Sequence, residues 1–228
     1  MKIGKDYLKG KNVVNLVLIV AALFLLAALL FSEKQSSVRL VLVTKSSLSM
    51  LFILTALLQQ HPVSGYFHLL LAGLIFCMMG DICLALPQAK AFMLGLIAFL
   101  LGHVFYLFGF ISLTDFYEWI SVEPLVILTA SAVVFAWLRP HLRSMFFPVL
   151  AYIVVITVML WGAWAVFKAR SYGFPGPMFI FAGAFFFYVS DFFVARNRFV
   201  RRGYVNRLFG LPLYYLGQFL LAFSVGLV

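Results

Sequence analysis

Long apolar runs alternate with short polar connections along most of the chain. Each run has roughly the 20 residues that an α-helix needs to cross a lipid bilayer, and prolines or charged residues mark many of its ends. The pattern predicts an all-α fold, a single bundle of eight transmembrane helices that forms one transmembrane domain over residues 1–228. The predicted spans are about residues 13–31, 38–58, 66–86, 91–111, 122–138, 145–167, 177–195 and 208–227.

The composition also indicates a membrane protein. Of 228 residues, 65% are hydrophobic and 11% are charged, and the mean hydropathy is +1.09. Soluble domains have about 25% charged residues. The net charge of +10 does not indicate nucleic-acid binding, because the basic residues are spread over tails and connections. We therefore expect a multi-pass protein of a bacterial inner membrane or a eukaryotic endomembrane, with no nucleic-acid partner; its oligomeric state stays open.

Basic residues are concentrated in every second connection. The connections after the first, third, fifth and seventh predicted spans carry ten lysines and arginines, whereas the others carry Lys168 and Arg170. The N-terminal tail, with four lysines, would lie on the same side as these two. One side of the membrane would therefore have ten basic residues and the other six. Because cytoplasmic loops carry an excess of Lys and Arg, we expect the side with ten to face the cytoplasm.

Six polar side chains interrupt the apolar runs in the same half of the bilayer. Asp81 and Asp191 lie roughly 6–9 Å below the face with the basic connections, at about 1.5 Å per residue. An ionisable residue inside a membrane costs about 2.5–3.5 kcal/mol, so it is a functional candidate. The convergence predicts a polar cavity in this half of the bilayer, towards the cytoplasmic leaflet. The six residues are Lys45, Asp81, His103, Tyr152, Asp191 and Gln218.

The same residues suggest an internal repeat. The dipeptide GD at 80–81 is matched by SD at 190–191, and LGH at 101–103 is matched by LGQ at 216–218. Because each half contains four predicted spans, the halves would have the same orientation. The pattern therefore indicates a 4+4 parallel repeat.

Structural explanations remain open for these residues. Asp81 and Asp191 could form structural ion pairs or cap helices, and Lys45 could snorkel to the interface or pair with an aspartate. His103 could form an interhelical hydrogen bond. The arginines between residues 196 and 207 could set the topology or contact lipid phosphates at the mouth of the cavity.

Several catalytic chemistries lack their motifs. The sequence contains no GxSxG, HExxH, Walker loop or paired CxxC. Two acids and one histidine are too few convergent ligands for a metal site, so no metal or cofactor is predicted. Two functions stay compatible with the sequence. They are acid–base catalysis by two carboxyl groups and proton-coupled transport.

Five segments carry a family resemblance. In chain order they are TKSSLSMLFIL, GDICLALPQAKAFMLGLIAFLLGHVFYLFGF, PVLAYIVVITVMLW, GAFFFYVSDFFVARNRF and YYLGQFLLAFSV. Together they resemble the YhhN-like lysoplasmalogenase family of integral membrane proteins, from the second predicted span onward. The resemblance implies hydrolysis of the vinyl ether bond of lysoplasmalogens to a fatty aldehyde and glycerophospho-ethanolamine or -choline. One departure is visible, because Ser46 and Ser47 stand where the family often has a proline.

The resemblance also implies site residues. Asp81 and Asp191, the acids of GD and SD, correspond to the presumed catalytic pair of the family, one protonated and one ionised; which is the acid stays open. The substrate would be a lysophospholipid among membrane lipids. A proton-coupled transporter that uses both acids as proton carriers is the main alternative, and a hydrolase or isomerase of another lysolipid is a third. Binding or supporting roles are expected for Lys45, His103, Tyr106, Tyr152, Ser190, Asn197, Tyr215 and Gln218.

Overall fold

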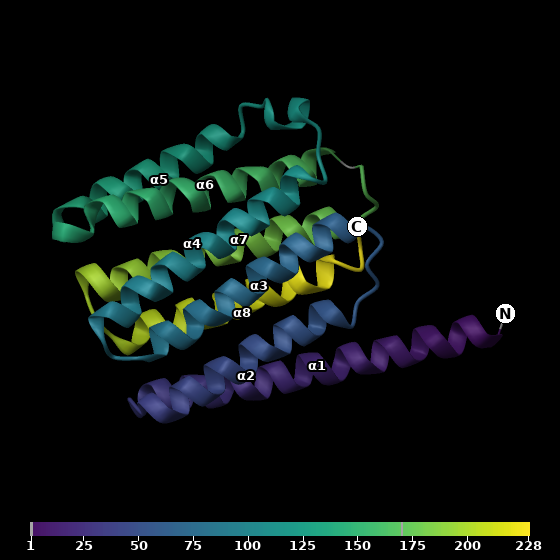
Figure 1. Ribbon diagram of the computed structural model, residues 1–228, viewed down its shortest axis with the longest axis horizontal. Helices are drawn as coiled ribbons and strands as arrows, with labels where there is room; N and C mark the ends of the chain where they lie inside the picture. Colours follow the sequence, from purple (N-terminus) through teal and green to yellow (C-terminus); the bar gives the residue numbers. More distant parts are fainter. Residues whose placement is uncertain (1, 170) are drawn as a thin grey trace.

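The computed structural model describes residues 2–169 and 171–228, and the side chains of residues 13–169 and 171–228, so that Arg170 lies outside the described residues. Within them the chain forms eight α-helices and no strand. In Figure 1 the helices run side by side, and the start of α1 projects beyond the others. The α-helices are α1 (Lys2–Lys34), α2 (Val38–Leu57), α3 (Ser64–Ala85), α4 (Ala89–Ile111), α5 (Pro124–Leu138), α6 (Phe146–Ala169), α7 (Gly176–Ala195) and α8 (Tyr204–Ser224). Short 3-10 turns at Phe116–Trp119, Arg139–His141 and Arg143–Met145 and a π-helical turn at Arg196–Val200 lie between them.

The all-α prediction is confirmed, and seven of the eight predicted spans meet the requirements of a membrane span. The exception is α8. It is long enough, with 21 residues, but it carries Asn206, Arg207 and Gln218 and is therefore less apolar than a candidate membrane span must be. The protein is therefore a multi-pass membrane protein, and the passage of α8 through the bilayer stays a prediction. The candidate spans are Val13–Lys34, Val38–Leu57, Ser64–Ala85, Ala89–Ile111, Pro124–His141, Arg143–Ala169 and Gly176–Val200.

Two helices, α1 and α8, begin more than two residues earlier than predicted. Helix α1 starts at Lys2 rather than at residue 13, because a helix can continue into water beyond the apolar part that crosses the membrane. Helix α8 starts at Tyr204 rather than at residue 208, and its first turn buries Asn206. Lysines and arginines near a helix end therefore indicate where the apolar segment ends, and the helix itself can continue beyond them.

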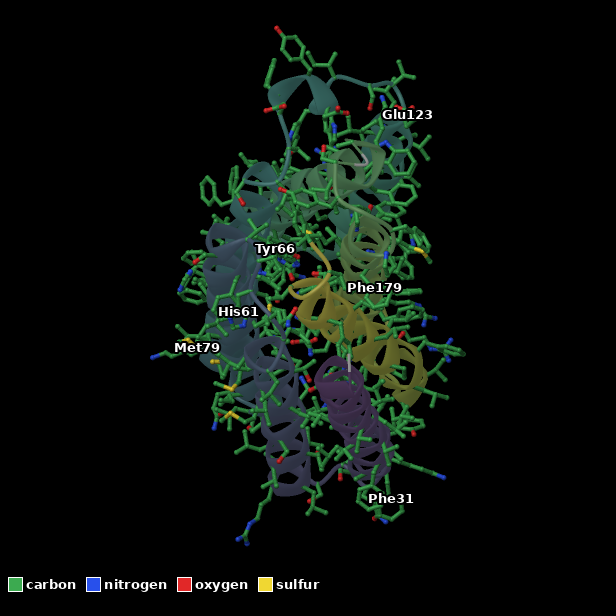
Figure 2. All side chains as sticks on the ribbon, turned by 90° about the vertical axis from the view of Figure 1, so that its right-hand side faces the viewer. Phe31, His61, Tyr66, Met79, Glu123 and Phe179 are labelled. Atoms are coloured by element: carbon green, nitrogen blue, oxygen red, sulfur yellow. The ribbon has the colours of Figure 1, made fainter. Side chains whose placement is uncertain are left out.

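The molecule has an apolar exterior and a partly polar interior. Phe24 and Phe31 are 75% and 60% exposed, whereas Lys45 and Asp81 are 3% and 1% exposed. Figure 2 looks along the helices and shows Phe31 at the outside and Tyr66 in the interior. The Tyr66 hydroxyl on α3 is 2.6 Å from that of Ser224 on α8. This distribution reverses that of a water-soluble protein and suits a surface that faces lipid.

Glycines bring two pairs of helices into close contact, α3 with α4 and α7 with α8. A Cβ atom added to Gly102 of α4 would lie 3.2 Å from the carbonyl oxygen of Gly73 of α3. A Cβ atom added to Gly217 of α8 would lie 2.7 Å from the carbonyl oxygen of Gly183 of α7. Small residues allow such approach between membrane helices. Both hairpins use it, but an internal repeat of the whole chain stays a prediction.

Gly217→Ala is expected to destabilise the protein by about 1–3 kcal/mol, because the added methyl group would press on backbone that cannot move independently. The measurement is thermal unfolding of the purified protein in detergent. Gly65→Ala is the matched control, since no atom lies within 4 Å of its added Cβ and alanine favours a helix. Equal unfolding temperatures for the two variants would show that α7 and α8 are not closely packed.

Candidate active site

Asp81 on α3 is buried and has three polar partners. The Lys45 amino group lies 3.0 Å from its Oδ1 atom. The hydroxyl groups of Ser49 and Tyr214 each donate a hydrogen bond of 2.7 Å to its Oδ2 atom. Lys45 and Ser49 are four residues apart on α2 and share a helix face, and Tyr214 comes from α8. One cation and two hydroxyl donors suit an ionised carboxylate.

Asp191 on α7 has different surroundings. Its side chain is 17% exposed, and the Tyr152 hydroxyl of α6 donates a hydrogen bond of 2.6 Å to its Oδ2 atom. The Nε2 atom of His103 on α4 is 3.9 Å from the same oxygen, which is too long for a hydrogen bond. Among the described side chains, no lysine or arginine lies within 4.0 Å of this carboxyl group. Asp191 therefore lacks the charge compensation that Asp81 receives.

Both aspartates line one cavity of about 110 Å³. Lys45, Tyr152 and Asn197 contribute further polar groups to its wall. Ser190 also lies in the wall, although its hydroxyl donates to the Phe187 carbonyl oxygen of its own helix. The remaining wall is mainly apolar. Its apolar residues from α4, α5 and α6 include Leu96, Phe99, Val134, Val149 and Ile156. The cavity thus combines two carboxyl groups with a surface that suits a hydrocarbon chain.

Four of the predicted supporting residues do not line this cavity, namely His103, Tyr106, Tyr215 and Gln218. Tyr106 on α4 donates a hydrogen bond of 2.7 Å to the Oε1 atom of Gln218 on α8, and both residues are fully buried. His103, also fully buried, lies beside Asp191 as described. In the part of the chain that the structure describes, both ring nitrogens of His103 and the Nε2 atom of Gln218 have no hydrogen-bond partner. These residues form a polar layer behind the cavity.

Sequence reasoning missed Ser49 and selected Tyr215 instead of Tyr214. The Tyr215 hydroxyl has no hydrogen-bond partner among the described residues, whereas Tyr214 contacts Asp81 directly. Both tyrosines lie within one helical turn of Gln218, so sequence spacing could not choose between them. Ser49 could have been found, because it follows Lys45 by four residues and therefore shares its face.

No three His, Cys, Asp or Glu side chains come together as potential metal ligands among the described residues. The groups beside the cavity are two carboxyls, an amine, the guanidinium of Arg207, phenols, hydroxyls and amides. A carboxyl group without a cation beside it can carry and donate a proton, and a hydrogen-bonded carboxylate can accept one. The arrangement can therefore support general acid–base chemistry on a bound molecule.

Comparison with known proteins gives lipid hydrolases as well as a relative without an assigned activity. Lysoplasmalogenase TMEM86B of Rattus norvegicus is 32% identical over 167 residues, which cover 72% of this chain and 64% of the rat protein. Lysoplasmalogenase TMEM86A of Homo sapiens is 29% identical over 160 residues, which cover 67% of this chain and 62% of the human protein. The uncharacterized membrane protein YhhN of Escherichia coli O157:H7 is 28% identical over 180 residues, or 78% of this chain and 84% of that protein.

The match to a family is longer than these pairwise similarities. No solved structure matches the chain significantly. The YhhN family matches residues 40–225, which include all of α3 to α8 and nearly all of α2. The chain therefore belongs to the YhhN family.

Proposed function

We propose that this protein is a lysoplasmalogenase-like hydrolase. It cleaves the vinyl ether bond of a lysoplasmalogen, a 1-alkenyl glycerophospho-ethanolamine or -choline, to a fatty aldehyde and the glycerophospho headgroup. The observation that carries the proposal is the presence of two carboxyl groups, one buried and one half-buried, with different polar partners in one cavity. The similarity to proteins named lysoplasmalogenase supports it.

The surroundings of the two acids suggest separate roles. Asp81 accepts hydrogen bonds from Lys45, Ser49 and Tyr214, and acts as the ionised carboxylate. Asp191 has Tyr152 as its hydrogen-bond donor and no lysine or arginine beside it within the described residues, so it carries the proton. This division resembles that of glycosidases, which stabilise a related oxocarbenium ion with one acid and one carboxylate.

The reaction consumes one water molecule. Asp191 transfers its proton to the outer carbon of the vinyl ether, and the carbon bonded to oxygen becomes an oxocarbenium ion. The Asp81 carboxylate stabilises this cation and accepts a proton from the water that adds to it. The resulting hemiacetal breaks its bond to the glycerol oxygen and loses its hydroxyl proton, the glycerol oxygen takes up one proton in exchange, and the aldehyde leaves. The proton accepted by Asp81 returns to Asp191 through solvent.

The position of the cavity suits such a lipid. A vinyl ether lies directly below the glycerol headgroup, and each aspartate lies about one helical turn before the end of its helix. The apolar wall around Phe99, Val149 and Ile156 is suited to hold the alkenyl chain. By the distribution of basic connections, the cavity belongs to the cytoplasmic leaflet.

Purified protein in liposomes is expected to release aldehyde from a vinyl-ether lysolipid without any ion gradient. An alkyl-ether lysolipid should not react, because it has no double bond to protonate, and an acyl lysolipid should not react by this route. Aldehyde is measured in all three cases. Solute uptake driven by a pH gradient, without aldehyde release, would instead support the proton-coupled transporter.

A further inference from the structure

A second cavity adjoins the first on the side of the α7–α8 connection. Its volume is about 460 Å³. Four arginines line it, Arg198, Arg201, Arg202 and Arg207, together with one carboxylate, Glu33. We call this second cavity the arginine vestibule. Its excess of positive charge suits an anion.

Few of these cations are neutralised by protein groups. Arg207 pairs with Glu33 at 3.7 Å. Arg198 lies over the ring of Phe92, 4.1 Å from its centroid, which orients the guanidinium without neutralising it. Arg201 and Arg202 are exposed, and within the described residues no carboxylate lies within 4.0 Å of them. Three guanidinium groups are thus available to a ligand.

The connection that carries these arginines has a defined shape. Asn206, which is 3% exposed, accepts a hydrogen bond of 2.6 Å from Arg196 and donates one of 2.8 Å to the Arg201 carbonyl oxygen. Asn197 accepts hydrogen bonds from the Asn206 side chain at 3.2 Å and from the Gly203 backbone at 3.0 Å. A free loop that served only to set topology would need no such internal network.

The arginine vestibule adjoins the cavity of the two aspartates. Both cavities share the lining residues Leu84, Phe92, Val194, Asn197, Phe199 and Arg207. On α3, Asp81 lines the inner cavity and Ala85 lines the vestibule, and about one helical turn of 5.4 Å separates them. In a lysoplasmalogen the three glycerol carbons separate the phosphate ester from the vinyl ether, so one molecule can reach both cavities.

We propose that the arginine vestibule binds the phosphate group of the substrate headgroup while the vinyl ether lies in the cavity of the two aspartates. The inference rests on the proposed function for the identity of the lipid. Arginine suits phosphate because its planar guanidinium donates two parallel hydrogen bonds to phosphate oxygens. The vestibule thus makes the protein selective for phosphate-bearing lipids over neutral alkenylglycerols.

The test compares two substrates that contain the same vinyl ether, a lysoplasmalogen with phosphoethanolamine and a 1-alkenylglycerol without phosphate. The variant combines Arg198→Gln, Arg201→Gln and Arg202→Gln. We expect its KM for the lysoplasmalogen to rise about tenfold or more at nearly constant kcat, because the lost contact binds ground state and transition state alike. Its KM and kcat for the alkenylglycerol should equal those of the wild type. Unchanged constants for this substrate would also show that the variant is folded.

The matched control combines Arg139→Gln and Arg143→Gln. These arginines are exposed in the α5–α6 connection, which lies at the same end of the helices as the α7–α8 connection in Figure 1, and they line neither cavity. The control variant should keep wild-type constants for both substrates. If the vestibule variant has an unchanged KM for the lysoplasmalogen, or loses both substrates equally, the phosphate site is refuted.

A binding experiment separates this inference from the proposed function. The wild type and the vestibule variant are titrated with an unreactive alkyl-ether lysophospholipid and with alkylglycerol. If the wild type binds the lysophospholipid more tightly than alkylglycerol and the variant does not, the phosphate site is supported. This holds even if no aldehyde is ever released, and in that case only the proposed reaction is refuted. Inorganic phosphate is the third ligand. If it displaces the lysophospholipid at comparable concentration, the site is one for free phosphate and the assignment to a lipid headgroup is overturned.

Discussion

Asp191→Asn is expected to lower the rate of aldehyde release by about 10²- to 10⁴-fold, the contribution that a general acid typically makes. The amide keeps the shape of the side chain and can still accept the hydrogen bond of Tyr152, but it has no proton acidic enough to transfer to carbon. The variant should therefore insert into the membrane and unfold at nearly the wild-type temperature. The measurement is kcat for a vinyl-ether lysolipid with purified protein.

Asp115→Asn is the matched control for this substitution. Asp115 is exposed, follows α4 and makes no side-chain hydrogen bond to the turn that it precedes, so its loss should leave kcat unchanged. A second comparison is Asp81→Asn, which removes the carboxylate that stabilises the cation and should also abolish most activity. Wild-type activity in Asp191→Asn would rule out this aspartate as the acid and with it the two-acid mechanism.

Lys45→Met is expected to destabilise the protein by about 3–5 kcal/mol, the usual cost of leaving one member of a buried ion pair without its partner. Asp81 is 1% exposed and would keep only the hydroxyl groups of Ser49 and Tyr214 as donors. Methionine fills a similar volume, so the effect would come from the lost charge rather than from a void. Thermal or denaturant unfolding in detergent measures it.

The double variant Lys45→Met with Asp81→Asn removes both charges together. It should regain most of the stability lost in Lys45→Met and yet remain inactive, which separates the structural role of Asp81 from its chemical role. Lys168→Met is the control, because Lys168 pairs with Glu123 at 3.9 Å in an exposed position where such pairs contribute about 0–1 kcal/mol. A double variant no more stable than Lys45→Met would argue against the ion pair as the cause.

Much of the fold could be predicted from the order of apolar runs. A bilayer imposes a minimum length on each helix, and the connections here are too short to hold further long helices, so the predicted ranges lie within a few residues of the helices except at the start of α1. Of the eight described α-helices, α8 alone is not a candidate membrane span, because the polar side chains that it contributes to the interior lower its apolar character. Hydropathy cannot distinguish such a helix from a surface helix.

The site was only partly predictable, because depth along a helix is easier to infer than rotation about it. Counting residues put Lys45, Asp81, Tyr152 and Asp191 at similar depth, and all four line one cavity. The same count also selected His103, which does not line the cavity. Counting residues gives the depth of a side chain but not the side of the helix that faces the cavity, because that side depends on neighbouring helices that the sequence does not specify. Differences in hydrogen bonding between the aspartates also arise from three-dimensional contacts.

The ion pair between Lys45 and Asp81 constrains how this protein can change over generations. A descendant that replaces either residue alone keeps a buried charge without its partner and loses stability, even if its lipid chemistry is no longer needed. Two nearly simultaneous replacements would be required to escape that penalty. Lineages that abandon the reaction can therefore keep both side chains long after selection for catalysis has ended, so that the presence of this pair alone does not prove an active enzyme.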